Sequence, residues 1–328
     1  MEIAKAVILA GRPRHDQPWP SVPTGSKHLV PLANKPILFH NLEELRRAGV
    51  LEANIAVEAD TGNSVRSAIR DGSDWHLTVA YTELDRGAGV HQAAAAARAF
   101  TRDEPVLVQR ADAVMEDTHT HIRAFADAEL DALVLRIASA SLPADRRIAG
   151  YLLSPWALRL LARGEGPEND VLPYLRDQGG RVHVSQVDAC LACDGGEESL
   201  LEANRRILQR LPRTVQRRWL TRSEVQGTVA LHPTAQLTRS LVRGPAFIGA
   251  RCRLTDAYVG PYTSIGADVV IDGAEVEHSV VLAGAQIGFV GSRIESSVIG
   301  RRARIGRGFG VPAGIRLSVG DDARVILG

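Results

Sequence analysis

Two groups of side chains have residue types and spacing that would suit metal or redox chemistry. The segment 116–121 carries carboxylates and imidazoles close together, although a polar loop that opens a helix accounts for the same residues, and we favour that interpretation. Cys190-x-x-Cys193 has the spacing of a reactive thiol pair. Its segment reads as a strand, in which positions three apart point to opposite faces. Neither group therefore predicts a functional site, and the elements around them must be considered.

Up to about residue 211, short β-branched runs alternate with amphipathic stretches. The runs predict strands at 6–11, 53–59, 77–83, 105–112 and 132–138. Apolar residues at helical spacing predict helices at 37–50, 63–72, 89–100, 120–130 and 197–211. This alternation predicts an α/β fold, a Rossmann-like doubly wound and mostly parallel sheet. Ligands bind such sheets beyond the carboxyl ends of the strands, so chemistry is expected just after Ala10, Thr82 and Asp112.

A second region follows with a six-residue period. An aliphatic residue precedes glycine at Ile265, Ile287, Ile299 and Ile305; the last three are spaced by twelve and six residues, and the pattern has a few slips such as Ile294. Such hexapeptide repeats predict a parallel β-helix, in which the aliphatic residue lies inside a triangular prism. We expect domains at 1–211 and 225–328, with 212–224 as a linker.

Composition excludes several classes of protein. The 328 residues carry 39 Lys+Arg and 38 Asp+Glu, so the net charge of +1 predicts neither nucleic-acid binding nor an acidic tail. No apolar run approaches the roughly 18 residues of a membrane span, and the first apolar run is too short for a signal peptide. Three cysteines do not make a disulfide framework. We therefore expect a cytoplasmic protein without a membrane or nucleic-acid partner.

Several segments together resemble a known family. They are LAG (9–11), SKHLVPLANKPILFHNLEELRRAGV (26–50), AIRDGSDWHLTVAY (68–81), DGGEESLLEANRRIL (194–208) and the stretch 243–287. They resemble the sugar-1-phosphate nucleotidyltransferases, in particular the long glucose-1-phosphate thymidylyltransferase type with a C-terminal left-handed β-helix. The resemblance implies that a sugar 1-phosphate attacks the α-phosphorus of a nucleoside triphosphate, with Mg²⁺ as cofactor and pyrophosphate as product.

The resemblance assigns the first loop, which begins at Leu9-Ala10-Gly11, to the triphosphate. The family loop is glycine-rich and contains an arginine, whereas this chain has three prolines between residues 12 and 20 and Gln17 at the arginine position. Proline removes backbone donors that would bind phosphate. Arg12 or Arg14 would substitute as catalytic residues, or both are solvated loop arginines. Lys27 matches a family lysine that contacts phosphate and is the best catalytic candidate.

The loop that the resemblance assigns to base recognition has also changed. Leu84 stands where the family glutamine reads a thymine or uracil edge, and leucine has no hydrogen-bonding group for that purpose. Gly89 is retained. It either allows the main chain to approach the nucleotide closely or is a structural turn glycine.

The resemblance also assigns metal and sugar residues. Asp112 and Asp194 match the family's magnesium carboxylates; the alternative is that they cap helices and turns. Tyr151 and Glu168 are implied as substrate-binding residues. Only 139–149 separates the strand at 132–138 from the segment of Tyr151, so much of the family's sugar-binding hairpin is missing.

Three hypotheses follow. The first is a nucleotidyltransferase that joins a nucleoside triphosphate to a phosphorylated small molecule, a sugar or sugar-like phosphate as in natural-product pathways. The second is a catalytically silent homologue that binds a ligand or a paralogous subunit and acts as a regulatory or scaffolding protein. The third is different chemistry, such as acyl transfer. The β-helix and the resemblance to the family predict a homo-oligomer.

Overall fold

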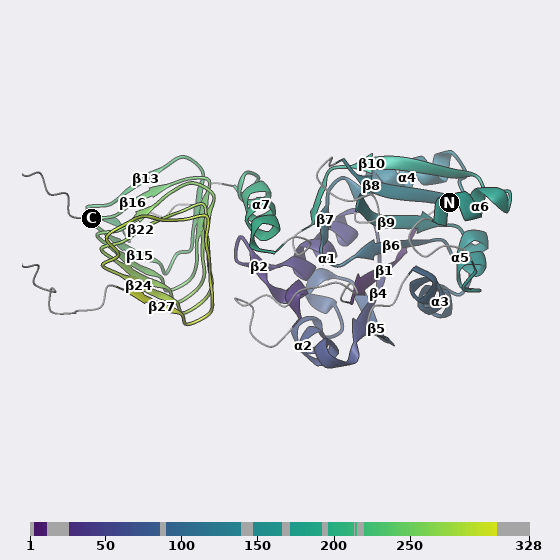
Figure 1. The fold of residues 1–328 in the computed structure, drawn as a ribbon, viewed down its shortest axis with the longest axis horizontal. Helices are drawn as coiled ribbons and strands as arrows, with labels where there is room; N and C mark the ends of the chain where they lie inside the picture. Colours follow the sequence, from purple (N-terminus) through teal and green to yellow (C-terminus); the bar gives the residue numbers. More distant parts are fainter. Residues whose placement is uncertain are drawn as a thin grey trace, which may run out of the picture.

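An α/β body is followed by a triangular prism of stacked coils (Figure 1). The structure is a computed structural model, and it describes residues 3–11, 26–85, 90–138, 147–165, 171–191, 196–212, 214 and 220–306. In these residues no helix is long and apolar enough to cross a membrane.

The α/β body is built on a seven-stranded sheet in the order β10-β8-β9-β6-β1-β4-β5. All neighbours pair in parallel except β9, which runs antiparallel to both β6 and β8. The mostly parallel sheet predicted from the sequence is thus confirmed. Its strands are β1 (Lys5–Ala10), β4 (Glu52–Glu58), β5 (Thr78–Leu84), β6 (Val106–Arg110), β8 (Ala132–Ile137), β9 (Ile148–Leu153) and β10 (Val182–Val187).

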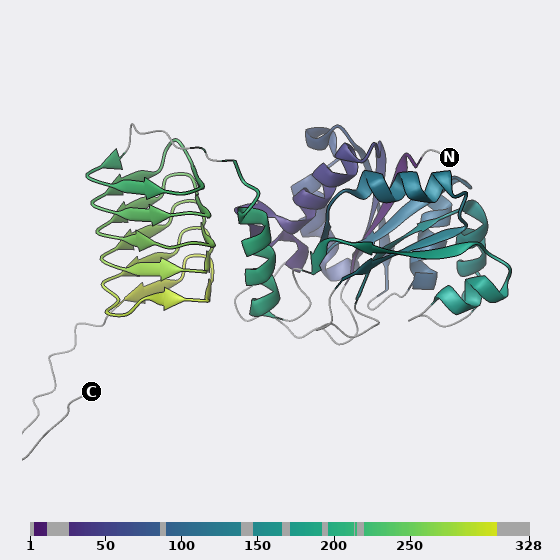
Figure 2. The same ribbon diagram turned by 90° about the horizontal axis from the view of Figure 1, so that it is seen from above.

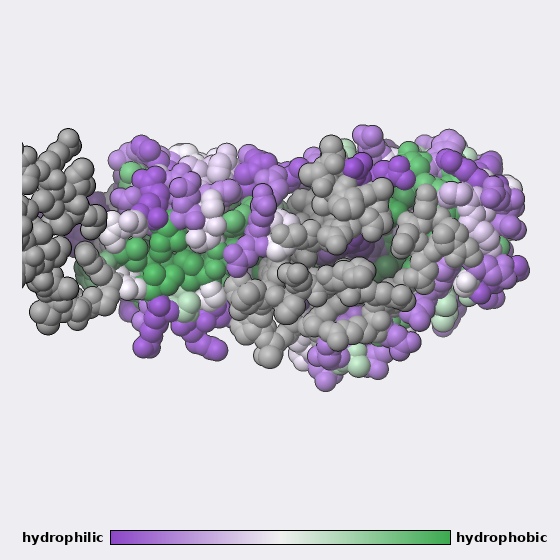
Figure 3. Space-filling model, viewed as in Figure 1, coloured by the Kyte–Doolittle hydropathy of each residue, from purple (hydrophilic) through white to green (hydrophobic). Residues whose placement is uncertain are grey.

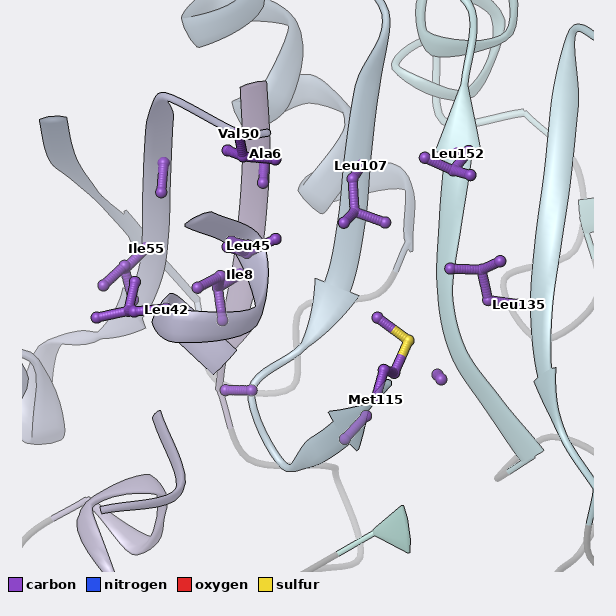
Figure 4. Close-up of a cluster of buried hydrophobic side chains, with 14 of the residues drawn as sticks. Ala6, Ile8, Leu42, Leu45, Val50, Ile55, Leu107, Met115, Leu135 and Leu152 are labelled. Atoms are coloured by element: carbon purple, nitrogen blue, oxygen red, sulfur yellow. The ribbon is translucent and has the colours of Figure 1, made fainter. Parts of the chain in front are cut away.

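Helices cover both faces of this sheet because nearly every central strand residue is apolar on both sides. One core cluster joins the sheet to α1, α2 and α4, and Figure 4 shows Ile8, Leu42 and Leu107 packed within it. The other cluster joins the opposite face to α3, α5 and α6. The helices are α1 (Ile37–Arg47), α2 (Ala59–Ile69), α3 (Val90–Thr101), α4 (Thr118–Asp127), α5 (Pro155–Leu161), α6 (Val171–Asp177) and α7 (Glu197–Leu208).

The direction of the chain across the sheet reverses beside β1. From β1 the chain moves outward to β4 and then β5, and it returns through α3 to β6 on the other side of β1. At such a switch point the connections on either side diverge, which opens a crevice beyond the carboxyl ends of the two strands. The geometry therefore favours a ligand site above Ala10 and Arg110. The short elements of the α/β body are η1 (Lys27–Leu29), β2 (Pro31–Leu32), β3 (Lys35–Pro36), η2 (Ser73–Trp75), β7 (Ala113–Met115) and β11 (Ala189–Leu191).

The second region consists of short strands in three parallel sheets of six, five and five strands. Figure 2 shows its coils stacked side by side, and Figure 3, along their axis, shows apolar side chains filling the triangle inside a polar rim. The aliphatic residues of the repeats, such as Ile265, Ile271 and Ile287, form this buried core. The region therefore has the predicted architecture, a left-handed parallel β-helix.

The bounds of its strands follow the three sheets. The first contains β12 (Leu220–Thr221), β15 (Gln236–Thr238), β18 (Arg253–Thr255), β21 (Val270–Asp272), β24 (Gln286–Gly288) and β27 (Arg304–Gly306). The second contains β13 (Glu224–Gln226), β16 (Leu241–Arg243), β19 (Tyr258–Val259), β22 (Glu275–Glu277) and β25 (Ile294–Glu295). The third contains β14 (Val229–Leu231), β17 (Ala246–Ile248), β20 (Thr263–Ile265), β23 (Val280–Val281) and β26 (Val298–Ile299).

Helix α7 lies between the α/β body and the β-helix in both ribbon views (Figures 1 and 2). Its fully buried Asn204 accepts hydrogen bonds from the Ala33 amide at 2.9 Å and the Ser264 hydroxyl at 2.6 Å, and donates to the Tyr262 carbonyl at 3.2 Å. One side chain thus connects the β2–β3 turn, α7 and the β-helix.

Candidate functional site

Gly11 directly follows β1 and is enclosed by side chains from two other segments. The imidazole Nε2 of His28, on η1, lies 3.3 Å from the Gly11 carbonyl oxygen. Glu58, the last residue of β4, lies on the other side, where its carboxylate would be 3.3 Å from any Cβ at position 11. Glycine at this position therefore allows a buried carboxylate and the main chain to approach each other.

Ala111, the residue after β6, is held by one hydrogen bond to β1 and one to α1. The Ala111 amide donates to the Leu9 carbonyl at 2.9 Å, which extends the strand pairing by one residue. The Asn41 side chain on α1, itself buried, donates to the Ala111 carbonyl at 2.7 Å. These contacts fix the main chain of Ala111, directly before Asp112.

Asp112 forms a bidentate ion pair with Arg110, the last residue of β6. Arg110 Nε donates to one carboxylate oxygen at 2.9 Å and Nη2 donates to the other at 2.8 Å. Asp112 lies in the turn that follows β6, and this turn brings its carboxylate against the Arg110 guanidinium. The Asp112 side chain is 5% exposed and that of Arg110 is 23% exposed.

The charges around Asp112 determine its ionisation. Burial by itself favours the neutral acid, but Arg110, through charge and hydrogen bonds, and then Lys27 and His28 outweigh burial and hold the pKa of Asp112 well below its usual range. Asp112 is therefore a carboxylate at neutral pH.

His28 is the opposite case. Burial lowers its pKa to about 4, against the attraction of Asp112 and with added repulsion from Lys27. A neutral His28 that donates from Nε2 to the Gly11 carbonyl carries a lone pair on Nδ1. Within the part of the chain that the structure describes, this buried Nδ1 has no hydrogen-bond partner.

The structure brings together several residues that the sequence predicted. Leu9 and Ala10 end β1 and lead to Gly11, Lys27 begins η1, and Asp112 follows β6. Leu84 ends β5 beside Glu58 and packs on the apolar cluster below.

Tyr151 lies deeper in the sheet. It pairs with Val108 of β6 and Val134 of β8, and its side chain is buried in the core between the sheet and helices α3 and α5. Because β8 and β9 are antiparallel neighbours, a short connection over 138–147 is enough to join them.

Five predicted residues lie outside the described residues. They are Arg12, Arg14, Gly89, Glu168 and Asp194. Their assigned roles stay predictions.

Sequence reasoning missed three residues of this edge, namely His28, Glu58 and Arg110. Glu58 is a carboxylate at the end of an otherwise apolar predicted strand, and Arg110 stands two positions before Asp112. A search for charged residues at strand ends at i and i+2 spacing would have found both. His28 gave no comparable signal because its role depends on contact with Gly11.

The described donor set differs from what Mg²⁺ takes. Magnesium prefers octahedral oxygen ligands and keeps several waters, whereas both Asp112 oxygens accept from Arg110. No group of three or more His, Cys, Asp or Glu side chains in the described ranges is arranged to hold a metal ion. The described residues alone therefore do not form a magnesium site, and the pairing of Asp112 with Asp194 around the ion stays a prediction.

Comparisons with known proteins agree with the fold. A family model described as nucleotidyl transferase matches residues 5–146. The chain is 33% identical to a glucose-1-phosphate thymidylyltransferase of Streptomyces griseus, over 98% of each chain, and 29% identical to one of Streptomyces antibioticus, over 98% of this chain and 99% of the relative. A Bacillus anthracis structure, described as a candidate glucose-1-phosphate thymidylyltransferase in complex with sucrose, superposes with a TM-score of 0.54 at 19% identity, over 65% of this chain and 97% of that one.

Proposed function

The chain belongs to the nucleotidyltransferase family, and from this premise we propose that it transfers a nucleotidyl group from a nucleoside triphosphate to a phosphorylated small molecule. An oxygen of the acceptor phosphate attacks the α-phosphorus. The new P–O bond forms as the bond to the bridging oxygen breaks, and pyrophosphate leaves. Little covalent chemistry falls to the protein, which positions the two anions and neutralises their charge.

One observation carries the proposal: fixed positive charge gathers at the switch point of the sheet. Lys27 on η1 and Arg110 at the end of β6 both act on Asp112, close to Gly11 of the first loop. These two cations balance the carboxylates of Asp112 and Glu58 and lie beside the first loop, which suits a phosphate chain. His28, with its lowered pKa, adds no charge at neutral pH, so Lys27 and Arg110 are the cations assigned to phosphate.

The acceptor we propose is a sugar or sugar-like 1-phosphate. The relatives reported above are described as glucose-1-phosphate thymidylyltransferases. The sequence between β8 and β9 is too short for the family's sugar-binding hairpin, so the proposal extends to acceptors of different shape, such as a cyclitol phosphate. Magnesium would enter with the triphosphate as part of the substrate. Arg12 or Arg14, Gly89, Tyr151, Glu168 and Asp194 keep their predicted roles within this proposal, as do self-association and a cytoplasmic location.

Pyrophosphate release tests this function directly. Nucleoside triphosphates are screened against sugar and cyclitol 1-phosphates, and release is expected only when both substrates are present. Absence of release in every combination, together with no triphosphate-dependent shift in melting temperature, would contradict the proposal. That result would favour the silent homologue, and thermal protection by coenzyme A would instead favour acyl transfer.

A further inference from the structure

The positive charge that faces Asp112 belongs to a side chain of the protein itself, Arg110. Arg110 reaches the carboxylate from two positions away, in a fork that uses both carboxylate oxygens. This geometry needs no distant segment to close, because the β6 ladder and the Asn41 hydrogen bond to Ala111 fix the intervening main chain. The pair is therefore present whenever the sheet is folded.

Burial makes it costly to replace Arg110 as the partner of Asp112. A carboxylate that is 5% exposed has little water to stabilise it, so separation from Arg110 leaves an uncompensated charge. Lys27 also contributes positive charge at Asp112. A divalent cation bound at Asp112 would have to displace the Arg110 guanidinium or lie beside it. Because the fixed main chain leaves the guanidinium little freedom to move, the two positive charges would repel each other at short range.

We propose that Asp112 is a positioning residue that holds the Arg110 guanidinium at the switch point, in the place that the resemblance gives to a protein-bound magnesium ion. The guanidinium is then the fixed cation for the phosphate groups of the substrate, and the ion pair sets its orientation. The inference rests on the proposed function only for the class of ligand that the crevice serves.

Metal binding by the protein alone tests this assignment, with Mn²⁺ as an electron-paramagnetic probe and Mg²⁺ in thermal melts. The variants are Arg110→Gln, which frees the carboxylate, and Arg110→Gln with Asp112→Asn. Arg239→Gln is a matched control, because Arg239 makes the same fork to Asp256 at 2.7 and 2.6 Å on the exposed β-helix.

Wild type is expected to show no Mn²⁺ binding that depends on Asp112. Arg110→Gln is expected to gain affinity for Mn²⁺ by about tenfold or more and to melt higher with Mg²⁺, while the double variant loses both effects and Arg239→Gln shows neither. Wild-type Mn²⁺ binding that Asp112→Asn abolishes would overturn the inference, and so would an Arg110→Gln variant without gain.

Two points keep the test decisive. Arg110→Met, which retains the aliphatic length, replaces Arg110→Gln if the latter does not fold. The measurement contains no nucleotide, so its failure is distinct from an absence of pyrophosphate release, which would count against the proposed function instead.

Discussion

Arg110 and Asp112 form a two-point ion pair at the carboxyl end of β6, with N–O distances of 2.9 and 2.8 Å. It joins the last residue of a buried strand to the residue that begins the turn after it. The same carboxylate is the one that resemblance to the family singles out, so its partner decides what the edge of the sheet can bind.

Loss of Arg110 should destabilise the fold at neutral pH. Arg110→Gln leaves a buried carboxylate without its main counter-charge, and we expect the free energy of unfolding to fall by about 3 kcal/mol. Urea denaturation at pH 7 measures the change. In Arg239→Gln, where both partners are about half exposed, the loss should stay below about 1 kcal/mol. Equal losses in the two variants would show that burial of the Asp112 pair adds nothing.

The buried His28 should make stability depend on pH. Its folded-state pKa is about 4 and its ordinary value is 6.5, so between these values the unfolded chain binds a proton that the folded chain does not. Stability is therefore unaffected by His28 above pH 6.5 and falls as the pH drops from 6.5 to 4, by about 3 kcal/mol in total. Urea denaturation of wild type and His28→Gln across this range measures the effect. The variant should show a shallower loss, and parallel curves would contradict the assignment.

Lys27 should matter for turnover more than for folding. If it neutralises phosphate charge, Lys27→Ala should lower kcat/KM for pyrophosphate release by about 10²–10³-fold with little change in melting temperature. Lys35→Ala is the control, because Lys35 pairs with Glu43 on the surface at 2.7 Å. A Lys27 variant as active as the Lys35 variant would remove Lys27 from the site.

Asn204 should couple the two regions of the chain. Asn204→Leu removes the partner of the Ala33 amide and of the Ser264 hydroxyl, and we expect a loss of about 2–4 kcal/mol. Calorimetry should then separate the unfolding of the α/β body from that of the β-helix. Ser264→Ala, which removes only one of these bonds, should cost about 1 kcal/mol. A single unshifted transition in Asn204→Leu would argue against the coupling.

Gly150 should tolerate no side chain. It lies on β9 where a Cβ would be 2.4 Å from the Val108 carbonyl oxygen, so Gly150→Ala must displace β6 and should cost about 1–3 kcal/mol. Gly291→Ala is the control, because a Cβ there meets nothing within 4 Å. Thermal melts of the two variants compare them, and similar melting temperatures would show that the strands separate without cost.

The predicted helices show where local pattern is sufficient. The helix predicted at 37–50 is α1 (Ile37–Arg47), which ends before Gly49 at a φ of 93°. The helix predicted at 63–72 instead starts at Ala59. The prediction began after Gly62 because glycine weakens a helical pattern. Packing accounts for this glycine, since a Cβ there would be 2.9 Å from a Val57 methyl group.

The sequence by itself determined the elements and the class of fold, because side-chain periods of two, 3.6 and six residues are local properties. It also placed Leu9, Ala10 and Asp112 at the carboxyl ends of strands or next to them, whereas Lys27 was assigned only through the resemblance to the family. Only the tertiary structure decided that His28 and Glu58 enclose Gly11, since strand order and the return through α3 bring segments distant in the sequence together. The tertiary structure also decided the partner of Asp112. A carboxylate after a strand suits a metal or an arginine equally, and here Asp112 is buried against Arg110, which is therefore its partner.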